Sequence, residues 1–308
     1  MVKKKKSLFD KMHDVKAGTP VGAGILLVAV VSFLFALIFP ISSRMGVYIR
    51  SAYDFKTELF LIFFVFLTYA ALGFADDLVR MFGKGREGRM GFWLGIDRRL
   101  KFLMQFILGA IAGYVMYSRL GISIVHIPLI DITLQLGWLF VPFAAFVIVS
   151  FSNAFNISDG LDGLSCGLLT ICLIAFGVIA ATNLDTPLSV FISIWLGSLL
   201  AFLYFNVYPA RVWLGDTGAF SFGATLGLIG LMTGNIIALV VIGGLFVIEA
   251  LSSAIQLFGW RFLDRPILPM APIHLSFQKI GWEEPKIVMR AWLVGIILAI
   301  FGLWLATI

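Results

Sequence analysis

Amide and carboxylate side chains recur every three residues in the stretch NAFNISDGLDG, which covers residues 153–163. The polar positions are Asn153, Asn156, Asp159 and Asp162. Because steps of three residues each drift by about 60° around an α-helix, an unbroken helix would spread these side chains over half of its circumference. The glycine that follows each carboxylate allows the chain to leave helical geometry. We therefore predict a break after Asn156 that turns the polar atoms into one cavity.

Other acidic residues stand where apolar stretches begin or end. Asp76 and Asp77 close one such stretch, and Asp216 opens another in the sequence GDTG. His274 lies in a later polar segment. Acidic side chains beside long apolar segments are costly to desolvate and are often functional. A single Asp could equally cap a helix or pair with Lys or Arg, so the interpretation depends on the whole set occurring together.

This set of side chains suits a hard cation. Oxygen ligands without cysteine favour Mg²⁺, which binds through one or two carboxylates together with substrate phosphates. Carboxylates, Mg²⁺ and nearby Lys or Arg are the components of phosphoryl-transfer sites. In GDTG, glycines flank the Asp just before an apolar helix, whose first N–H groups we expect to face an anionic group. The sequence therefore favours magnesium-dependent chemistry on a phosphate-bearing substrate.

The elements that carry these residues are predicted by composition. The 308 residues are 60% hydrophobic and only 13% charged, which leaves too little polar surface for a soluble domain. A helix needs about 20 apolar residues to cross a bilayer, and lipid excludes open strands. We therefore predict an all-α, polytopic integral membrane protein with about nine transmembrane helices. The predicted spans are centred near residues 21–41, 58–74, 100–118, 136–152, 161–182, 188–207, 218–233, 235–257 and 288–307.

Basic residues orient the predicted helices. With the N-terminus in the cytoplasm, the cytoplasmic segments 1–19, 75–101, Arg211 and 258–290 carry 19 of the 23 Lys and Arg residues, as the positive-inside rule requires. Nine spans then place the C-terminus outside, and we expect no cleavable signal peptide. The net charge of +6 suits lipid headgroups and anionic substrates. We expect the lipid bilayer, and no nucleic acid, as a partner.

In this orientation the acidic residues and His274 all fall on the cytoplasmic side. We predict one transmembrane catalytic domain over residues 1–308, with its active site on cytoplasmic segments. These segments are 75–101, 153–163, 206–218 and 258–287. An ion-coupled membrane transporter is the alternative from a different class. It would carry acids at mid-membrane positions, where only Glu249 lies well within a predicted span.

Six motifs then occur in one order: KAGTPVGAG, DDLVR, GIDRRLKFLMQ, NAFNISDGLDGLS, NVYPARVWLGDTGAFSFG and APIHLSFQKIGWEEPKIVMRAW. Together, over residues 13 to about 292, they resemble the phospho-N-acetylmuramoyl-pentapeptide transferase (MraY) family of the polyprenyl-phosphate N-acetylhexosamine-1-phosphate transferases. The resemblance implies an Mg²⁺-dependent enzyme of the bacterial cytoplasmic membrane whose active site faces the cytoplasm. Its substrates would be undecaprenyl phosphate and UDP-MurNAc-pentapeptide, and its products lipid I and UMP, in peptidoglycan synthesis.

The resemblance also implies roles for single residues. Asp216 matches the Mg²⁺ ligand, and Asp76 and Asp77 match paired acids of the polyprenyl-phosphate and metal region, where they are further candidate ligands. His274 joins these three as a catalytic candidate. A general base has been proposed at the position of Asp76, but a phosphate monoester oxygen is already ionised near pH 7, so we expect positioning and charge neutralisation to suffice.

Nine further residues match substrate-binding positions of the family. They are Lys16, Arg80, Lys101, Asn153, Asn156, Asp159, Asp162, Asn206 and Trp213. Lys16 matches a lysine that reaches the nucleotide, and the last part of the 153–163 motif lines the nucleoside pocket. Trp213 stands where the family usually has a Phe packed on uracil, and an indole stacks at least as well. Arg80 stands where Lys is common and binds phosphate with fork geometry.

One difference from the family's motifs leaves the identity of the UDP-linked sugar donor open. The family's triple histidine reads His274, Leu275 and Ser276 here. The alternatives are therefore the sister branch, which transfers GlcNAc-1-phosphate from UDP-GlcNAc to undecaprenyl phosphate, and an inactive homologue. The oligomeric state is also open, with a homodimer among the alternatives.

Overall fold

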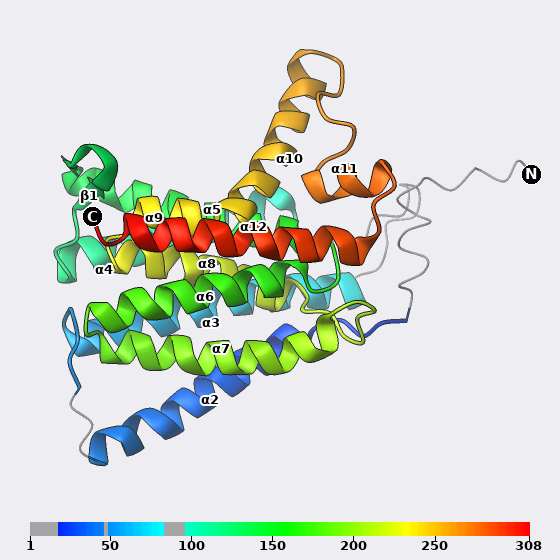
Figure 1. The fold of residues 1–308 in the computed structure, drawn as a ribbon. Helices are drawn as coiled ribbons and strands as arrows, with labels where there is room; N and C mark the ends of the chain where they lie inside the picture. Colours follow the sequence, from blue (N-terminus) through cyan, green and yellow to red (C-terminus); the bar gives the residue numbers. More distant parts are fainter. Residues whose placement is uncertain (1–17, 46–48, 83–95) are drawn as a thin grey trace, which may run out of the picture.

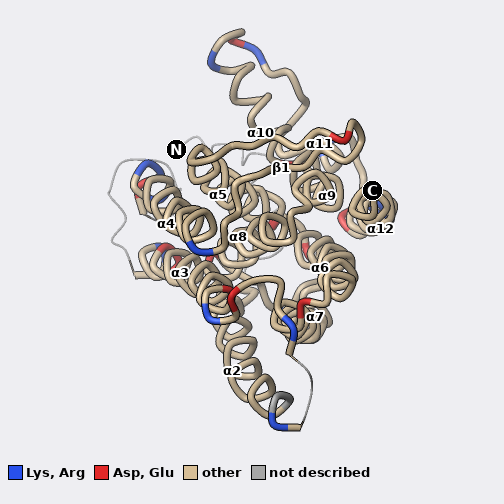
Figure 2. The backbone as a smooth tube through the Cα atoms, turned by 90° about the vertical axis from the view of Figure 1, so that its left-hand side faces the viewer, with Lys and Arg blue, Asp and Glu red and all other residues tan. Residues whose placement is uncertain are grey.

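The computed structural model describes residues 18–45, 49–82 and 96–308, and most of them are helical (Figure 1). The long helices are α2 (Ala23–Arg44), α3 (Phe55–Phe82), α4 (Arg98–Arg119), α5 (Phe140–Ser158), α6 (Leu164–Thr182), α7 (Thr186–Asn206), α8 (Asp216–Met232), α10 (Gly244–Phe262) and α12 (Glu284–Leu305). Two short helices, α9 (Ile236–Ile242) and α11 (Ile273–Lys279), complete the set. Figure 2 shows that most of the helix length carries no charged residue. An all-α membrane protein is therefore confirmed.

Eight of the described helices are long and apolar enough to cross a membrane. The remaining predicted span, 218–233, corresponds to α8, which has 17 residues, all of them buried. It lies at the centre of the bundle beside α3 and α5 (Figure 2). A helix that is apolar on every side belongs in such a core.

Glycines bring α8 close to its neighbours. A Cβ on Gly73 of α3 would lie 2.2 Å from the carbonyl oxygen of Asp216, and one on Gly223 would lie 2.3 Å from that of Phe151 in α5. Small residues permit this approach of helix backbones in membranes. The start of α8, which carries Asp216, is thereby held directly against α3.

Two predicted boundaries were wrong. The segment 75–101 was predicted as a cytoplasmic loop, but α3 continues to Phe82, so Asp76, Asp77 and Arg80 lie on its last turns. The predicted span 235–257 is divided at Gly243 into α9 and α10. Helix α10 then tilts away from the bundle, and α11 returns beside it (Figure 1).

The segment between α4 and α5 contains a small sheet that the sequence did not predict. Strands β1 (Ile124–Ile127) and β2 (Ile132–Gln135) pair antiparallel, with His126 opposite Thr133. Single 3₁₀ turns follow each strand, η1 (Pro128–Ile130) and η2 (Gly137–Leu139). This hairpin lies at the same end of the bundle as the C-terminus (Figure 1).

The predicted active-site segments gather at the other end. The end of α3, the start of α4, the α5–α6 and α7–α8 connections and α11 all lie there (Figure 1). The described chain also begins at this end, where Val21 contacts the α7–α8 connection. The fold thus brings polar segments that are far apart in the sequence to one end of the apolar bundle.

Candidate active site

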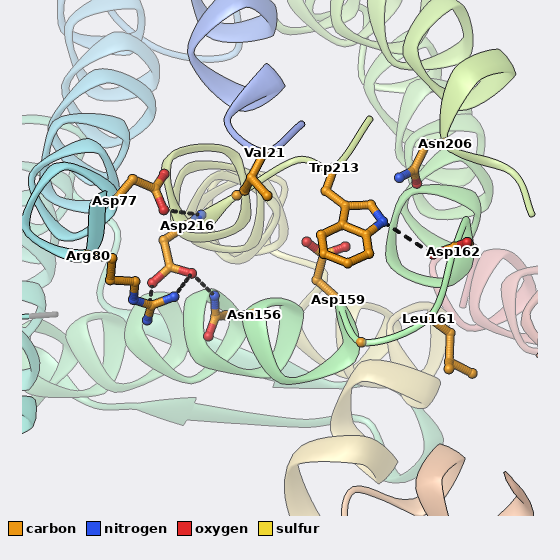
Figure 3. Close-up of a pocket in the computed structure, with 12 residues that line it drawn as sticks. Val21, Asp77, Arg80, Asn156, Asp159, Leu161, Asp162, Asn206, Trp213 and Asp216 are labelled. Atoms are coloured by element: carbon orange, nitrogen blue, oxygen red, sulfur yellow. Dashed lines mark hydrogen bonds and ion pairs between the residues drawn. The ribbon is translucent and has the colours of Figure 1, made fainter. Parts of the chain in front are cut away.

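One cavity collects most of the predicted site residues (Figure 3). It has a volume of about 290 Å³ and opens at the end of the bundle described above. It is lined by Val21, Asp77, Arg80, Asn156, Asp159, Gly160, Leu161, Asp162, Asn206, Trp213, Gly215 and Asp216. The lining comes from α3, α5, α7, α8, the α5–α6 and α7–α8 connections and Val21 before α2, so it forms only when these parts of the chain are assembled.

At one end of the cavity, two buried carboxylates share their cations. Nη2 of Arg80 lies 2.8 Å from Oδ2 of Asp76 and 2.8 Å from Oδ2 of Asp216. Nζ of Lys101 lies 2.9 Å from the same oxygen of Asp76 and 3.9 Å from that of Asp216. Asn156 adds a hydrogen bond from Nδ2 to Oδ1 of Asp216, at 3.0 Å. Buried carboxylates need such partners, and the result is a compact group of fixed charges of both signs.

Asp77 has a different role from its neighbour. Its Oδ1 accepts the backbone N–H of Asp216 (3.1 Å), and its Oδ2 accepts the backbone N–H (3.0 Å) and the hydroxyl (2.7 Å) of Thr217. We expected the N-terminus of α8 to face an anionic group, and that group is the carboxylate of Asp77. This carboxylate caps α8 and complements its dipole. Asp77 therefore fixes where Asp216 begins its helix.

The carboxylates do not form a ready-made cage. Among the described residues, no group of three or more His, Cys, Asp or Glu side chains could together hold a metal ion. Asp77 is occupied as the cap, and Oδ1 of Asp76 accepts the backbone N–H of Ile96 at 2.7 Å. Asp216 does line the cavity. Its carboxylate fits Mg²⁺, which takes one or two carboxylates and completes its shell with water and phosphate oxygens.

At the other end of the cavity, Asp162 holds the α7–α8 connection in place. Its Oδ2 accepts the backbone N–H of Ala210 at 2.9 Å, and its Oδ1 accepts the indole N–H of Trp213 at 3.3 Å (Figure 3). Trp213 lines the cavity, and this contact satisfies the polar N–H of its indole ring. Asp162 therefore contributes to the site by holding the side chain of Trp213 in position.

Asn206 links the same two segments from the end of α7. Its Oδ1 accepts the backbone N–H of Gly163 (3.2 Å), and its Nδ2 donates to the carbonyl of Val212 (3.0 Å). Gly163 has a φ of +79°, a conformation that favours glycine. The predicted break in the 153–163 motif is confirmed, because α5 ends at Ser158 and α6 begins at Leu164.

The N-terminal motif is joined to the site by its backbone. The N–H of Trp213 donates to the carbonyl of Pro20 at 2.8 Å, and the N–H of Gly22 donates to the carbonyl of Trp213 at 3.1 Å. Val21 consequently lines the cavity. Lys16, the predicted nucleotide-binding lysine, lies outside the described residues.

Four described residues of the predicted site are not part of the cavity lining. Asp76 and Lys101 belong to the charge group around Arg80 and Asp216, whereas Asn153 and His274 make contacts elsewhere. Nδ2 of Asn153 donates to Oε1 of Gln105 (2.7 Å), between α5 and α4. His274 is only 2% exposed, and its Nδ1 lies 3.0 Å from Oε2 of Glu249. Its ring packs against Gly160 from behind the cavity wall.

The structure also adds residues that sequence reasoning missed. Oε1 of Glu284 accepts the backbone N–H of Asp162 at 2.6 Å, and Thr217 anchors Asp77. Both lie inside quoted motifs, WEEPK and GDTG, where each could have been suspected. Glu249 stood out as an acid in an apolar span, but nothing in the sequence pointed to its partner His274.

The sequence is similar to a known protein family and to proteins of known name. Residues 59–234 match the family model described as glycosyl transferase family 4. A phospho-N-acetylmuramoyl-pentapeptide-transferase of Bacillus pumilus is 33% identical over 95% of this chain and 85% of its own length. Proteins of the same name from Caldanaerobacter subterraneus and Borrelia hermsii are 35% and 36% identical, over 93% and 79% of this chain and 84% and 72% of their own lengths.

Proposed function

This chain belongs to glycosyl transferase family 4 and, within it, to the phospho-N-acetylmuramoyl-pentapeptide-transferase family, and we propose that it transfers phospho-N-acetylmuramoyl-pentapeptide from UDP-MurNAc-pentapeptide to undecaprenyl phosphate. The products are lipid I and UMP. The observation that carries this proposal is one cavity lined by the aromatic ring of Trp213 at one end and by Arg80 beside the carboxylate of Asp216 at the other.

The two ends of the cavity suit the two parts of a nucleotide diphosphate. The face of Trp213 offers a stacking surface for uracil, and Asp162 holds that ring in place. Arg80 and Lys101 provide positive charge for the phosphates near Asp216. Uridine therefore lies toward the α7–α8 connection, and the diphosphate lies toward the end of α3.

The reaction requires little covalent chemistry from the protein. An oxygen of the lipid phosphate bonds to the β-phosphorus of the donor, and the bond from this phosphorus to the bridging oxygen breaks to release UMP. No base is needed to ionise the attacking phosphate. The side chains act by holding both phosphates in line and by offsetting charge that develops on their oxygens.

Mg²⁺ would add to this neutralisation when bound, and Asp216 is the residue that would hold it, together with substrate phosphates. Arg80 and Lys101 already contact Asp216 and Asp76. Phosphates that enter between these groups exchange carboxylate–cation contacts for phosphate–cation contacts. Asp216, which loses cation contacts in this exchange, would be paired instead by the metal that it holds, so that its buried charge is not left unpaired.

The membrane arrangement supports a site that meets a lipid and a water-soluble substrate. The cavity opens at the end of an apolar bundle, where both can reach it. The excess of Lys and Arg in the segments at this end favours a cytoplasmic location in a bacterial inner membrane. The whole chain acts as one catalytic unit in this proposal, because residues from Val21 to Asp216 line the same cavity.

Release of UMP by purified protein tests the proposal. We expect release from UDP-MurNAc-pentapeptide when undecaprenyl phosphate and Mg²⁺ are present, and loss of release after chelation with EDTA. UDP-GlcNAc should be run in parallel, because Leu275 and Ser276 replace two histidines of the family motif. Release from UDP-GlcNAc alone would reassign the chain to the sister branch. A substrate-dependent ion flux in liposomes without UMP release would favour the transporter instead.

A further inference from the structure

Three polar side chains on one face of α10 hold the segment 267–274. Glu249, Ser252 and Gln256 are spaced three and four residues apart, as neighbours on a helix surface are. Oε1 of Gln256 accepts the backbone N–H of Leu268 at 2.9 Å, and Oγ of Ser252 accepts that of Ile273 at 3.0 Å. In these two contacts the segment contributes only backbone N–H groups. Glu249 is the member of the row that contacts a side chain of α11.

The partner of Glu249 is the imidazole of His274. Oε2 of Glu249 and Nδ1 of His274 are 3.0 Å apart, and the two residues are 6% and 2% exposed. The contact joins a carboxyl oxygen directly to Nδ1 and so fixes the orientation of the ring. Its opposite edge, Nε2, is directed toward Gly160.

His274 supports the cavity wall at Gly160. An ideal Cβ on Gly160 would lie 2.7 Å from Nε2 and 3.1 Å from Cε1 of His274. The ring thus occupies the space where any other residue would place its side chain. Gly160 itself lines the cavity, between Asp159 and Asp162. A shift of the ring would move the turn that carries both carboxylates.

From this geometry we propose that Glu249 is a positioning residue of the donor site, which acts through His274 on the Gly160 turn. The proposal rests on the proposed function, since it assigns the turn to binding of the uridine nucleotide. Removal of Glu249 leaves the buried imidazole without its acceptor, and the ring is then free to leave the wall. The effect should fall on donor binding and spare the lipid acceptor.

Steady-state kinetics of Glu249→Ala and the isosteric Glu249→Gln test the proposal. We expect Glu249→Ala to raise KM for the UDP-linked donor by about tenfold, with KM for undecaprenyl phosphate unchanged and kcat changed less. Glu249→Gln keeps an acceptor oxygen for Nδ1 and should recover much of the loss. His274→Ala should match Glu249→Ala, and the double variant should be no worse than either single one.

Ser252→Ala is the matched control, because it removes another contact between α10 and the same segment without touching His274. We expect it to lower the thermal unfolding temperature in detergent while leaving donor KM unchanged. An equal rise in donor KM in Ser252→Ala would overturn the proposal, since any loosening of α11 would then suffice. Additive effects of the Glu249 and His274 changes would overturn it as well.

Calorimetric measurement of UMP binding to the detergent-solubilised protein distinguishes a failure of the proposed function from a failure of the positioning role of Glu249. If the wild-type chain neither binds UMP nor releases it from the donor, the proposed function fails. If the wild type does both and Glu249→Ala binds UMP equally well, only the positioning role of Glu249 fails. We expect the variant to bind UMP about tenfold more weakly than the wild type.

Discussion

Asp216 is the residue on which the other groups of the site converge. Its backbone N–H is capped by Asp77, and its carboxylate meets Arg80, Lys101 and Asn156. It also stands at the first position of α8, pressed against α3. Each of these contacts restricts the carboxylate to one place at the cavity wall. Such restriction is what electrostatic catalysis requires, because the groups need not reorganise as charge develops.

Asp216→Asn tests this role directly. The substitution keeps the size of the side chain and one acceptor oxygen but removes the charge that would hold Mg²⁺. We expect UMP release to fall by at least about a hundredfold, measured at saturating Mg²⁺ and donor. An unchanged unfolding temperature in detergent would show that the loss is chemical. Retained turnover would remove Asp216 from the metal-binding role.

Trp213 permits a second prediction, on donor affinity. Base stacking on an aromatic ring is worth about 1–3 kcal/mol, so Trp213→Ala should weaken UMP binding by about tenfold or more. Trp213→Phe keeps a stacking face and loses only the N–H that donates to Asp162. It should stay within a few-fold of the wild type. Calorimetry with UMP compares the two variants. An equal loss of UMP affinity in both would show that the effect comes from the hydrogen bond to Asp162 and not from stacking on the ring.

At the residue scale, sequence reasoning found which side chains matter better than it found what each one does. The repeat of polar residues at every third position predicted the chain break, and the structure confirms it. The same repeat could not say that Asn153, on the same helix as Asn156, bonds to Gln105 of α4 while Asn156 lines the cavity. Asp162 and Asn206 were expected to bind substrate, yet their oxygens hold backbone N–H groups, a distinction that only tertiary contacts reveal.

At the scale of elements, hydropathy located the helices but misjudged where they end. Helix α3 continues through DDLVRMF because an α-helix does not stop where its residues become polar. The extra turns place Asp76 and Arg80 four residues apart, so that they pair on one helix face. The division at Gly243 was equally invisible, since the helices on both sides of it are mostly apolar.

The contact between α3 and α8 gives a prediction on stability. In Gly73→Ala the new methyl group would overlap the carbonyl of Asp216, so the helices must separate at the site. We expect a destabilisation of about 1–3 kcal/mol, together with reduced UMP release. Gly197→Ala in α7 is the matched control, because no atom lies within 4 Å of its new Cβ. Its unfolding temperature should stay the same or rise slightly, and equal losses in both variants would contradict the packing argument.

For the whole molecule, the sidedness of the bundle is the property to test. The β1–β2 hairpin and the α10–α11 turn lie toward opposite ends, and the chain's two cysteines, Cys166 and Cys172, are both buried. Single substitutions Leu129→Cys and Asp264→Cys therefore report on each end. In intact spheroplasts, a membrane-impermeant maleimide should label only Leu129→Cys. It should reach Asp264→Cys after the membrane is opened. The reverse pattern would invert the proposed topology.

The backbone contact between Pro20 and Trp213 has a consequence for how the protein is made. The start of α2 is synthesised early, and its partner emerges only after most of the chain has left the ribosome. At ordinary rates of translation the interval is roughly ten to forty seconds. During this time the segment before α2 lacks the backbone partner that Trp213 provides in the folded protein. The cavity therefore cannot form before the α7–α8 connection has been synthesised, so the proposed nucleotide site stays incomplete until about two thirds of the 308 residues exist.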